Sequence, residues 1–272
     1  MDQEMIKVKY KLCELEEILL EIETVVQDAI QRENIKTANN NLNFLLYTLG
    51  KSIVTIRETI TLCWAGYPDG ALSLSRNIFE QFVHVAYIEG HKKSKKLDSL
   101  LEKYNADYNY QRLKNLKWEA EYISRNSEKK AYYQKEIIAI KQKYQIDKRQ
   151  KDYWWAGLGS FATMCDNVAL QSESFKMWVR NMQLIYKRAC LAIHSSCMGN
   201  IIRLGSNLAD VDVGPWDKGQ EVSLFLASSG LFFIALSVYK ELNENYEDLQ
   251  SKLGALVCCY WDILNKKKSE SK

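Results

Sequence analysis

Helix-breaking residues are scarce in this chain, and their scarcity constrains the fold more than any other feature. Only two prolines and 12 glycines occur among 272 residues. Sheet-rich and loop-rich folds need such residues at their turns, whereas long helices run without them. Apolar residues recur at spacings of three and four, and no run shows clear apolar–polar alternation. The sequence therefore predicts an all-α fold.

The apolar spacing and the breakers also predict the order of the helices. Six core helices are expected over 3–32, 38–64, Pro68 to near Gly90, 174–204, 220–243 and 246–265. Two more, about 94–125 and 128–147, should fold back on each other as a hairpin. We expect a helical bundle core of about five or six helices from 1–90 and 152–265, with 91–151 as an inserted hairpin and 266–272 as a disordered tail.

The segment 91–151 differs from the rest of the chain in charge. It holds 17 lysines and arginines against 8 aspartates and glutamates, together with seven of the 16 tyrosines. Basic side chains interleaved with aromatic rings can contact phosphates and stack on bases. The candidate nucleic-acid contacts are Lys92, Lys93, Lys95 and Lys96. A solvated hairpin, or one that binds a protein partner, explains the same composition.

The cysteines and histidines argue against a metal centre. The seven cysteines form no C-x-x-C pair, and none of the three histidines has a cysteine at ligand spacing. Reduced thiols that fill a core are typical of a cytoplasmic protein. No glycine-rich phosphate loop and no G-x-S-x-G motif occurs, so kinase and hydrolase classes lack support. We expect no metal and no cofactor.

One segment has the composition of a membrane span. Residues 222–238 carry no charge over 17 residues, which is at the short edge of what crosses a bilayer. A central helix buried on all sides has the same composition, and this is our prediction; the alternative is a membrane anchor. The polar N-terminus predicts no signal peptide.

The helix after Pro68 carries a polar stripe on an apolar background. Arg76, Glu80 and His84 stand at i, i+4 and i+8, so they drift by only ~40° per step. We take these three as candidate substrate-binding residues, with Glu80 steering the Arg76 cation. The alternative is a structural ion pair that links helices, with no role in binding.

A second pair lies on the helix predicted over 174–204. Arg188 and His194 have five residues between them, and this Arg-x5-His spacing resembles the motif of the HEPN superfamily. Those domains are all-helical and often act as metal-independent ribonucleases. Ala189 stands where that superfamily commonly has a polar residue. Positions six apart on an ideal helix differ by about 120°. Both side chains would therefore meet one phosphate only if the helix is distorted or if two copies combine their motifs in a dimer, and we expect a homodimer.

A closer resemblance is to a family of uncharacterised, mostly bacterial all-helical domains. Its pattern has a Gly and an Ala before an L-x-R-x-x-x-E helix, a Trp-containing segment, and a late Tyr and His. The matching residues are Gly66, Ala71, Leu74, Arg76, Glu80, Trp154 or Trp155, Tyr186 and His194. The resemblance covers roughly 40–205, and proposals for that family lean towards phage defence and toxin-like roles.

These observations lead to one functional hypothesis and two alternatives. Metal-free RNA cleavage needs a group to move the 2′-hydroxyl proton and a cation to hold the developing negative charge. His194 suits the first role and Arg188 the second, with Arg76 as a further cation. The alternatives are a non-catalytic module that binds a protein through the 91–151 hairpin or the first helix, and a small-molecule or nucleotide sensor. His194 as a core histidine is the structural alternative.

Overall fold

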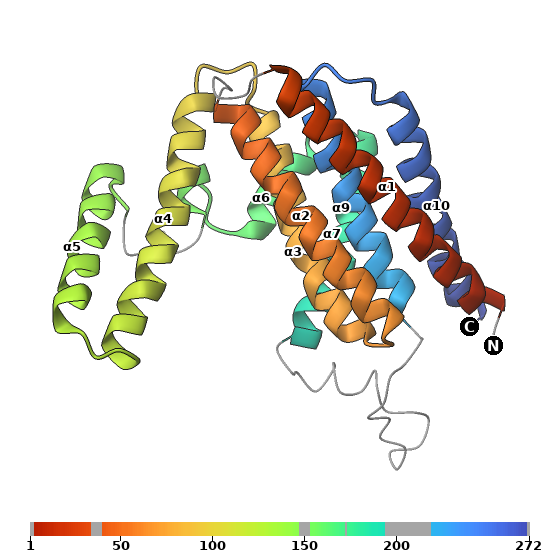
Figure 1. Ribbon diagram of the computed structural model, residues 1–272, viewed down its shortest axis with the longest axis horizontal. Coiled ribbons are helices and arrows are strands. Elements are labelled where there is room, and N and C mark those ends of the chain that lie inside the picture. Colours follow the sequence, from red (N-terminus) through yellow and green to blue (C-terminus); the bar gives the residue numbers. More distant parts are fainter. Residues whose placement is uncertain (1–2, 34–39, 147–152, 172, 194–218, 271–272) are drawn as a thin grey trace, which may run out of the picture. The chain divides into compact units, whose positions relative to one another are not determined.

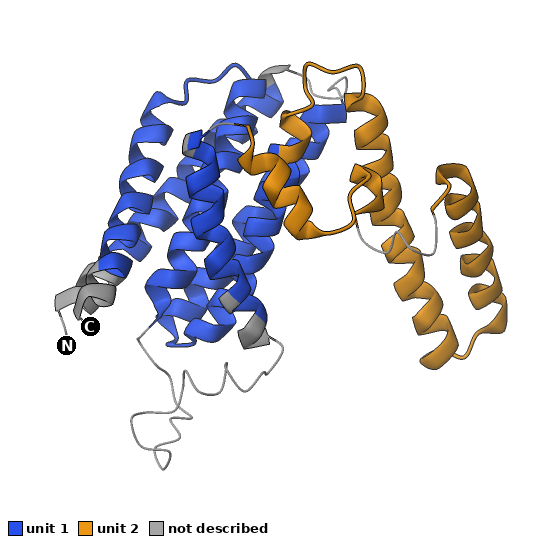
Figure 2. Cartoon of the chain, turned by 180° about the vertical axis from the view of Figure 1, so that it is seen from behind, with its two compact units in different colours: residues 1–86, 173–272 blue, residues 87–172 orange. Residues whose placement is uncertain are grey.

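The all-α prediction is confirmed. The computed structural model (Figure 1) describes residues 3–33, 40–146, 153–171, 173–193 and 219–270. Across these ranges it has nine α-helices, one short 3-10 turn and no strand. The chain divides into two compact units, residues 1–86 with 173–272 and residues 87–172, as Figure 2 shows.

Unit 1 is a helical bundle made from both ends of the chain. Its helices are α1 (Gln3–Glu33), α2 (Asn40–Trp64), α3 (Pro68–Glu89), α7 (Glu173–Ile193), α9 (Gln220–Glu241) and α10 (Glu247–Glu270). The last turn of α3 already belongs to unit 2. The core is formed by the apolar faces of these helices, with Leu15, Ile56 and Leu253 among the fully buried residues.

Helix α9 lies at the centre of unit 1. It contacts α1, α2, α7 and α10, and Gly230 allows a close approach to α3. A Cβ at Gly230 would lie 2.8 Å from Ile78 Cγ2 and 3.1 Å from the Ile78 carbonyl oxygen. Among the described residues, α9 is the one helix long and apolar enough to cross a membrane, but 78% of its apolar window is buried inside the protein. The expected buried central helix is what the structure contains.

The turn between α2 and α3 explains where α3 begins. Gly66 has φ +79°, and the Tyr67 N–H donates to the Leu62 carbonyl at 2.8 Å, which closes the C-terminus of α2. Pro68 then occupies the first position of α3, where its missing N–H costs no helical hydrogen bond. Asp69 in the first turn complements the helix dipole.

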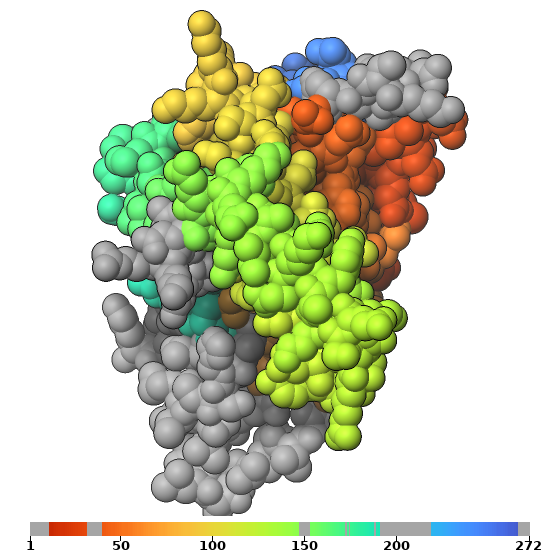
Figure 3. All heavy atoms as spheres, turned by 90° about the vertical axis from the view of Figure 1, so that its left-hand side faces the viewer, coloured from red at the N-terminus to blue at the C-terminus, as the bar shows by residue number. Residues whose placement is uncertain are grey.

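Unit 2 contains the predicted hairpin. Helices α4 (Leu97–Tyr122) and α5 (Ser127–Tyr144) pack against each other, and the 3-10 turn η2 (Trp154–Ala156) packs on α4. Only Ile137 of α5 is buried, and Figure 3 shows the outer face of α5 open to view. The Asn126 side chain accepts a hydrogen bond from the Lys129 N–H and so begins α5.

Two elements differ from the sequence prediction. Helix α6 (Phe161–Ala169) was not predicted, and unit 2 therefore extends beyond the hairpin to residue 172. Helix α10 continues to Glu270, past residue 265 where the sequence predicted it to end. The predicted helix over 174–204 is described as α7 up to Ile193, and its remainder lies outside the described residues.

Candidate functional site

The polar stripe of α3 is held in place by the residues next to it. Ser75 is fully buried, and its hydroxyl donates to the Ser223 carbonyl of α9 at 2.8 Å. Gln81 accepts a hydrogen bond of 2.6 Å from the Ser52 hydroxyl of α2. These buried bonds fix the rotation of α3 on both sides of Arg76 and Glu80.

Arg76, Glu80 and Tyr186 form one cluster between α3 and α7. Arg76 Nε donates to Glu80 Oε1 at 2.9 Å, and the Tyr186 hydroxyl donates to the same oxygen at 2.8 Å. The Arg76 guanidinium carbon lies 5.3 Å from the centroid of the Tyr186 ring, within cation–π range. The Phe79 ring also packs against the Tyr186 ring, with their centroids 5.4 Å apart. The three side chains therefore fix one another's positions.

The electrostatics of the cluster keep Tyr186 and Arg76 each in one protonation state. Burial raises the pKa of the Tyr186 hydroxyl, and the charge of Glu80 and its hydrogen bond raise it further. Tyr186 therefore remains a neutral donor. Burial lowers the pKa of Arg76, but the charge and hydrogen bond of Glu80 outweigh this and raise it. Arg76 is a permanent cation beside an acceptor.

The Arg76 guanidinium has hydrogen-bond donors that the cluster does not use. Its hydrogen bond to Glu80 uses Nε alone, and no other described residue hydrogen-bonds to its guanidinium. The side chains of Arg76 and Glu80 are each 24% exposed, so the cluster is open to solvent. The two terminal nitrogens of an arginine form a planar fork that matches phosphate and carboxylate oxygens. Glu80 Oε2 can accept a hydrogen bond from a hydroxyl of the same ligand.

His84, the third residue of the predicted stripe, has a different environment. Neither Arg76 nor Glu80 hydrogen-bonds to it. Its ring is half-buried with Nε2 inside the protein, and burial together with Lys51 lowers its pKa to about 4. His84 is thus neutral at physiological pH and belongs with α2 more than with the cluster.

The remaining predicted site residues lie elsewhere. Arg188 is on α7, two residues after Tyr186, but its side chain lies outside the described residues, as does His194. The four turn lysines, Lys92, Lys93, Lys95 and Lys96, are exposed in unit 2 in the turn between α3 and α4. The Lys92 Nζ atom lies 3.8 Å from Glu89 Oε2.

No group of three or more His, Cys, Asp or Glu that could hold a metal occurs in the described part of the chain.

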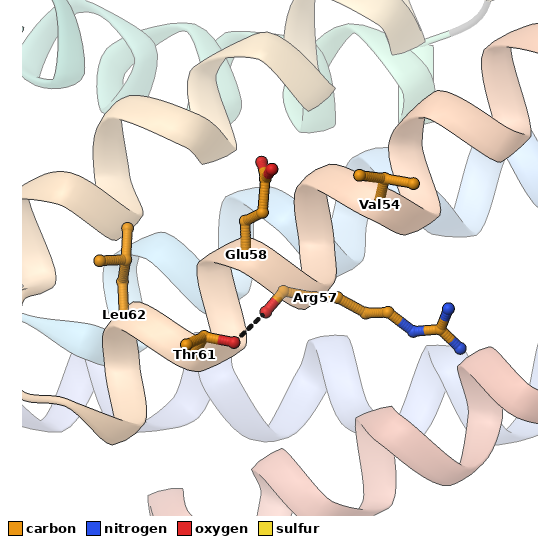
Figure 4. A pocket seen from close by; sticks show the side chains of 5 residues that line it. All are labelled: Val54, Arg57, Glu58, Thr61 and Leu62. Atoms are coloured by element: carbon orange, nitrogen blue, oxygen red, sulfur yellow. Dashed lines mark hydrogen bonds between the residues drawn. The ribbon is translucent and has the colours of Figure 1, made fainter.

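A pocket of about 470 Å³ lies along α2 (Figure 4), lined by Val54, Arg57, Glu58, Thr61 and Leu62. Arg57 is already bonded to Glu23 at 2.8 Å, and the Thr61 hydroxyl donates to the Arg57 carbonyl. Both terminal nitrogens of Arg57 bond to Glu23, whereas the ion pair of Arg76 with Glu80 uses only Nε, so this pocket is a weaker site for an anion than Arg76.

The fold and the cluster define an all-helical protein with a partly buried Arg–Glu–Tyr site. The chain belongs to a family of unknown function (DUF5677), whose model matches residues 42–208, more than half of its length. That range includes the cluster and the hairpin. No curated protein and no solved structure matches the chain.

The sequence predicted no binding or catalytic role for Tyr186, which was identified only as a position of the family pattern. Its spacing from Glu80, 106 residues along the chain, leaves no local signal that the two side chains meet. Helical periodicity predicts which face of a helix is apolar but not which helix packs against it.

Proposed function

We propose that the protein is a HEPN-like, metal-independent endoribonuclease in which the cluster binds a phosphate of RNA. The carrying observation is the Arg76 guanidinium, held by Glu80 and Tyr186 while its terminal nitrogens bond to no other described residue. An arginine fixed by protein contacts costs little further ordering when an anion binds. A toxin or phage-defence effector is the biological role that suits such an activity.

The position of the cluster on α7 supports a role for Arg188 and His194. Tyr186 joins α7 to α3 two residues before Arg188, which corresponds to about 3 Å along a helix axis. The Arg-x5-His motif therefore begins at the turn of α7 that the cluster fixes. The cluster and the Arg-x5-His motif both lie within residues 42–208, the range that the family model matches.

The proposed reaction uses the 2′-hydroxyl of RNA as the nucleophile. His194 removes the 2′-hydroxyl proton, and the oxygen forms a bond to the adjacent phosphorus. Arg188 and Arg76 hold the negative charge that develops on the phosphoryl oxygens. The bond to the 5′-oxygen then breaks, and that oxygen takes up a proton from the imidazolium. The products are a 2′,3′-cyclic phosphate and a 5′-hydroxyl.

Incubation of the purified protein with total RNA in EDTA tests the proposal. The wild-type protein should cleave, and His194→Ala should abolish cleavage while leaving the circular dichroism spectrum unchanged. Arg180→Gln is a matched control, because Arg180 is an exposed arginine of α7 outside the cluster. Absence of cleavage by the wild-type protein under all tested conditions would overturn the proposal.

The exposed aromatic residues of the hairpin favour a second candidate, a non-catalytic module that binds a protein. Trp118, Tyr122 and Tyr132 are 57%, 62% and 58% exposed. Large exposed aromatic side chains are typical of protein interfaces. If the protein is such a module, the affinity of the hairpin for its protein partner depends little on salt, and RNA is not cleaved. A sensor that binds a nucleotide at Arg76 is distinguished by a thermal shift with nucleotides and no cleavage.

A further inference from the structure

The hairpin exposes aromatic rings at the end where α4 is joined to α5 (Figure 1). We call this end, residues 112–135, the hairpin tip. Trp118 is 57% exposed there, Tyr122 is 62% exposed and Tyr132 is 58% exposed. The buried residues of the two helices are others, namely Leu101, Ala106, Tyr110, Ala120 and Ile137. Tryptophan is highly buried on average in folded proteins, so an exposed ring outside the core indicates an interaction surface.

The exposed rings have open faces. Trp118 and Tyr122 are one helical turn apart on α4, with ring centroids 5.5 Å apart and ring planes inclined by 40°. Tyr132 lies edge-on to Tyr133 on α5, with centroids 5.6 Å apart. Each of the three exposed residues has more than half of its surface open to solvent. A flat ligand can therefore stack on these rings without displacing contacts within the protein.

The two helices hold the rings at one end of the hairpin. Lys130 Nζ lies 2.8 Å from Glu121 Oε1 and so pairs α5 with α4 near the turn. Trp118 lies three residues before Glu121 on α4. Tyr133 lies three residues after Lys130 on α5, so in this antiparallel pair the rings of both helices lie at about the same level. The aromatic surface is thus built on regular helices and exists before any ligand binds.

Basic side chains surround the exposed rings. Residues 112–135 contain seven lysines and arginines against three glutamates. The side chains of Arg125, Lys129 and Lys135 are exposed, and no carboxylate of a described residue pairs with them. Glu119 and Glu128 are also exposed, but the cations outnumber them. The hairpin tip therefore has a positive potential around its rings, which suits a polyanion.

The combination of rings and lysines favours nucleic acid over a protein partner. The cores of protein interfaces are rich in aromatic residues but poor in lysine and glutamate, whereas here both are interleaved with the rings. Surfaces that bind single-stranded nucleic acid combine cations for the phosphates with aromatic rings on which bases stack. A duplex keeps its base faces stacked on one another, so only a single strand can use such rings.

We propose that the hairpin tip binds single-stranded RNA. The bases stack on Trp118, Tyr122 and Tyr132, and the lysines at 129 and 135 contact phosphates. This surface is separate from the four turn lysines, which precede α4 at the other end of that helix. The choice of RNA as the ligand rests on the proposed function, but the surface shares no residue with the cluster.

Fluorescence anisotropy of a labelled, unstructured 2′-O-methyl RNA of about 12 nucleotides measures binding by the full chain. Its methylated 2′-oxygens cannot attack phosphorus, so binding is measured whether or not the protein cleaves RNA. The single strand should bind at least about fivefold more tightly than the same sequence as a duplex. Trp118→Ala and Tyr122→Ala should each weaken binding by about fivefold or more, with unchanged circular dichroism, because each removes one stacked base contact.

Replacing Trp118 by leucine separates stacking from apolar contact. Leucine keeps an apolar side chain but has no ring face, so binding should fall as it does for Trp118→Ala, while Trp118→Phe should stay within about threefold of the wild type. Lys129→Gln with Lys135→Gln should reduce the slope of log affinity against log salt concentration by about 0.7 for each phosphate lost. Tyr47→Ala is the matched control, because Tyr47 is 59% exposed on α2 in unit 1; it should bind as the wild type does.

The proposal is overturned if the wild-type protein does not bind the single strand, or if the duplex binds as tightly. It is also overturned if Trp118→Leu matches the wild type, a result that would assign the rings to an apolar contact with a protein. Cleavage of unmodified RNA without any loss of binding in Trp118→Ala would overturn this proposal and leave the proposed function standing. The expected binding losses in a protein that does not cleave RNA would support this proposal and overturn the proposed function.

Discussion

Replacing Tyr186 by phenylalanine tests whether the cluster holds α7 on α3. The change removes one hydroxyl that donates to Glu80 Oε1 at 2.8 Å in a partly buried setting. A hydrogen bond to a charged acceptor contributes about 1.5–3 kcal/mol. Glu80 keeps its bond to Arg76 and is 24% exposed, so water can replace part of the loss. We therefore expect a loss of about 1.5 kcal/mol in the free energy of unfolding.

Thermal and urea unfolding of the purified protein measure this loss. A change of about 1 kcal/mol shifts the melting temperature of a domain this size by about 2–4 °C, so Tyr186→Phe should lower it by about 3–6 °C. The urea m-value should not change. Tyr67→Phe is the matched control, because Tyr67 is 46% exposed; it should change the unfolding free energy by less than about 0.5 kcal/mol.

A double-mutant cycle between Tyr186→Phe and Glu80→Gln isolates the contact itself. The two changes should couple by about 1 kcal/mol, because both remove the same hydrogen bond. A loss below about 0.5 kcal/mol together with no coupling would refute the inference that this bond joins α3 to α7.

Three other features of the structure lead to predictions of their own. Gly230→Ala should destabilise the protein by about 1–3 kcal/mol through overpacking against Ile78. Gly254→Ala should instead stabilise it by up to about 1 kcal/mol, because a Cβ there would meet nothing within 4 Å. Urea unfolding of both variants measures the two effects, and equal effects would contradict the prediction. Burial and Lys51 lower the pKa of His84 to about 4 in the folded protein, from 6.5 in the unfolded chain. Between these two pH values the unfolded chain binds one more proton at this site than the folded protein does. The contribution of His84 to stability is therefore complete above pH 6.5 and is lost as the pH falls towards 4. His84→Gln should remove a part of this acid sensitivity on the order of 2 kcal/mol, measured by urea unfolding from neutral to acidic pH. Replacing the four turn lysines by glutamine should reduce the slope of log affinity for RNA against log salt concentration by about 0.7–0.9 for each phosphate that the variant no longer binds. If the affinity of the wild-type protein for RNA does not respond to salt, these lysines bind no RNA.

The helical fold was predictable because its signals are local. The spacing of apolar residues and the Pro68 turn predicted α1, α2, α3 and the hairpin close to their observed bounds. Helix α6 was missed although its signals were present. Ser160 caps it by accepting a hydrogen bond from the Thr163 N–H, and Met164 and Val168 are buried one turn apart. At nine residues it is too short for periodicity alone to identify.

The site was predictable only in part, because its contacts are distant in sequence. The spacing of Arg76 and Glu80 on one helix predicted their ion pair, which the structure contains. It predicted equally that His84 would share their environment, yet burial beside α2 separates its chemistry from theirs. The contact with Tyr186 depends on which helices pack together, and tertiary packing is not encoded in any short segment.

The most direct test of the proposed function is the chemistry of RNA ends after cleavage in EDTA. With a synthetic RNA of one preferred cleavage site, the account predicts a 2′,3′-cyclic phosphate on one product and a 5′-hydroxyl on the other. A 2′-deoxy nucleotide at that site should abolish cleavage, and Arg76→Gln should slow it by about 10²-fold or more while Arg180→Gln does not. A 3′-hydroxyl product, cleavage of the 2′-deoxy substrate, or no cleavage at all would contradict the account.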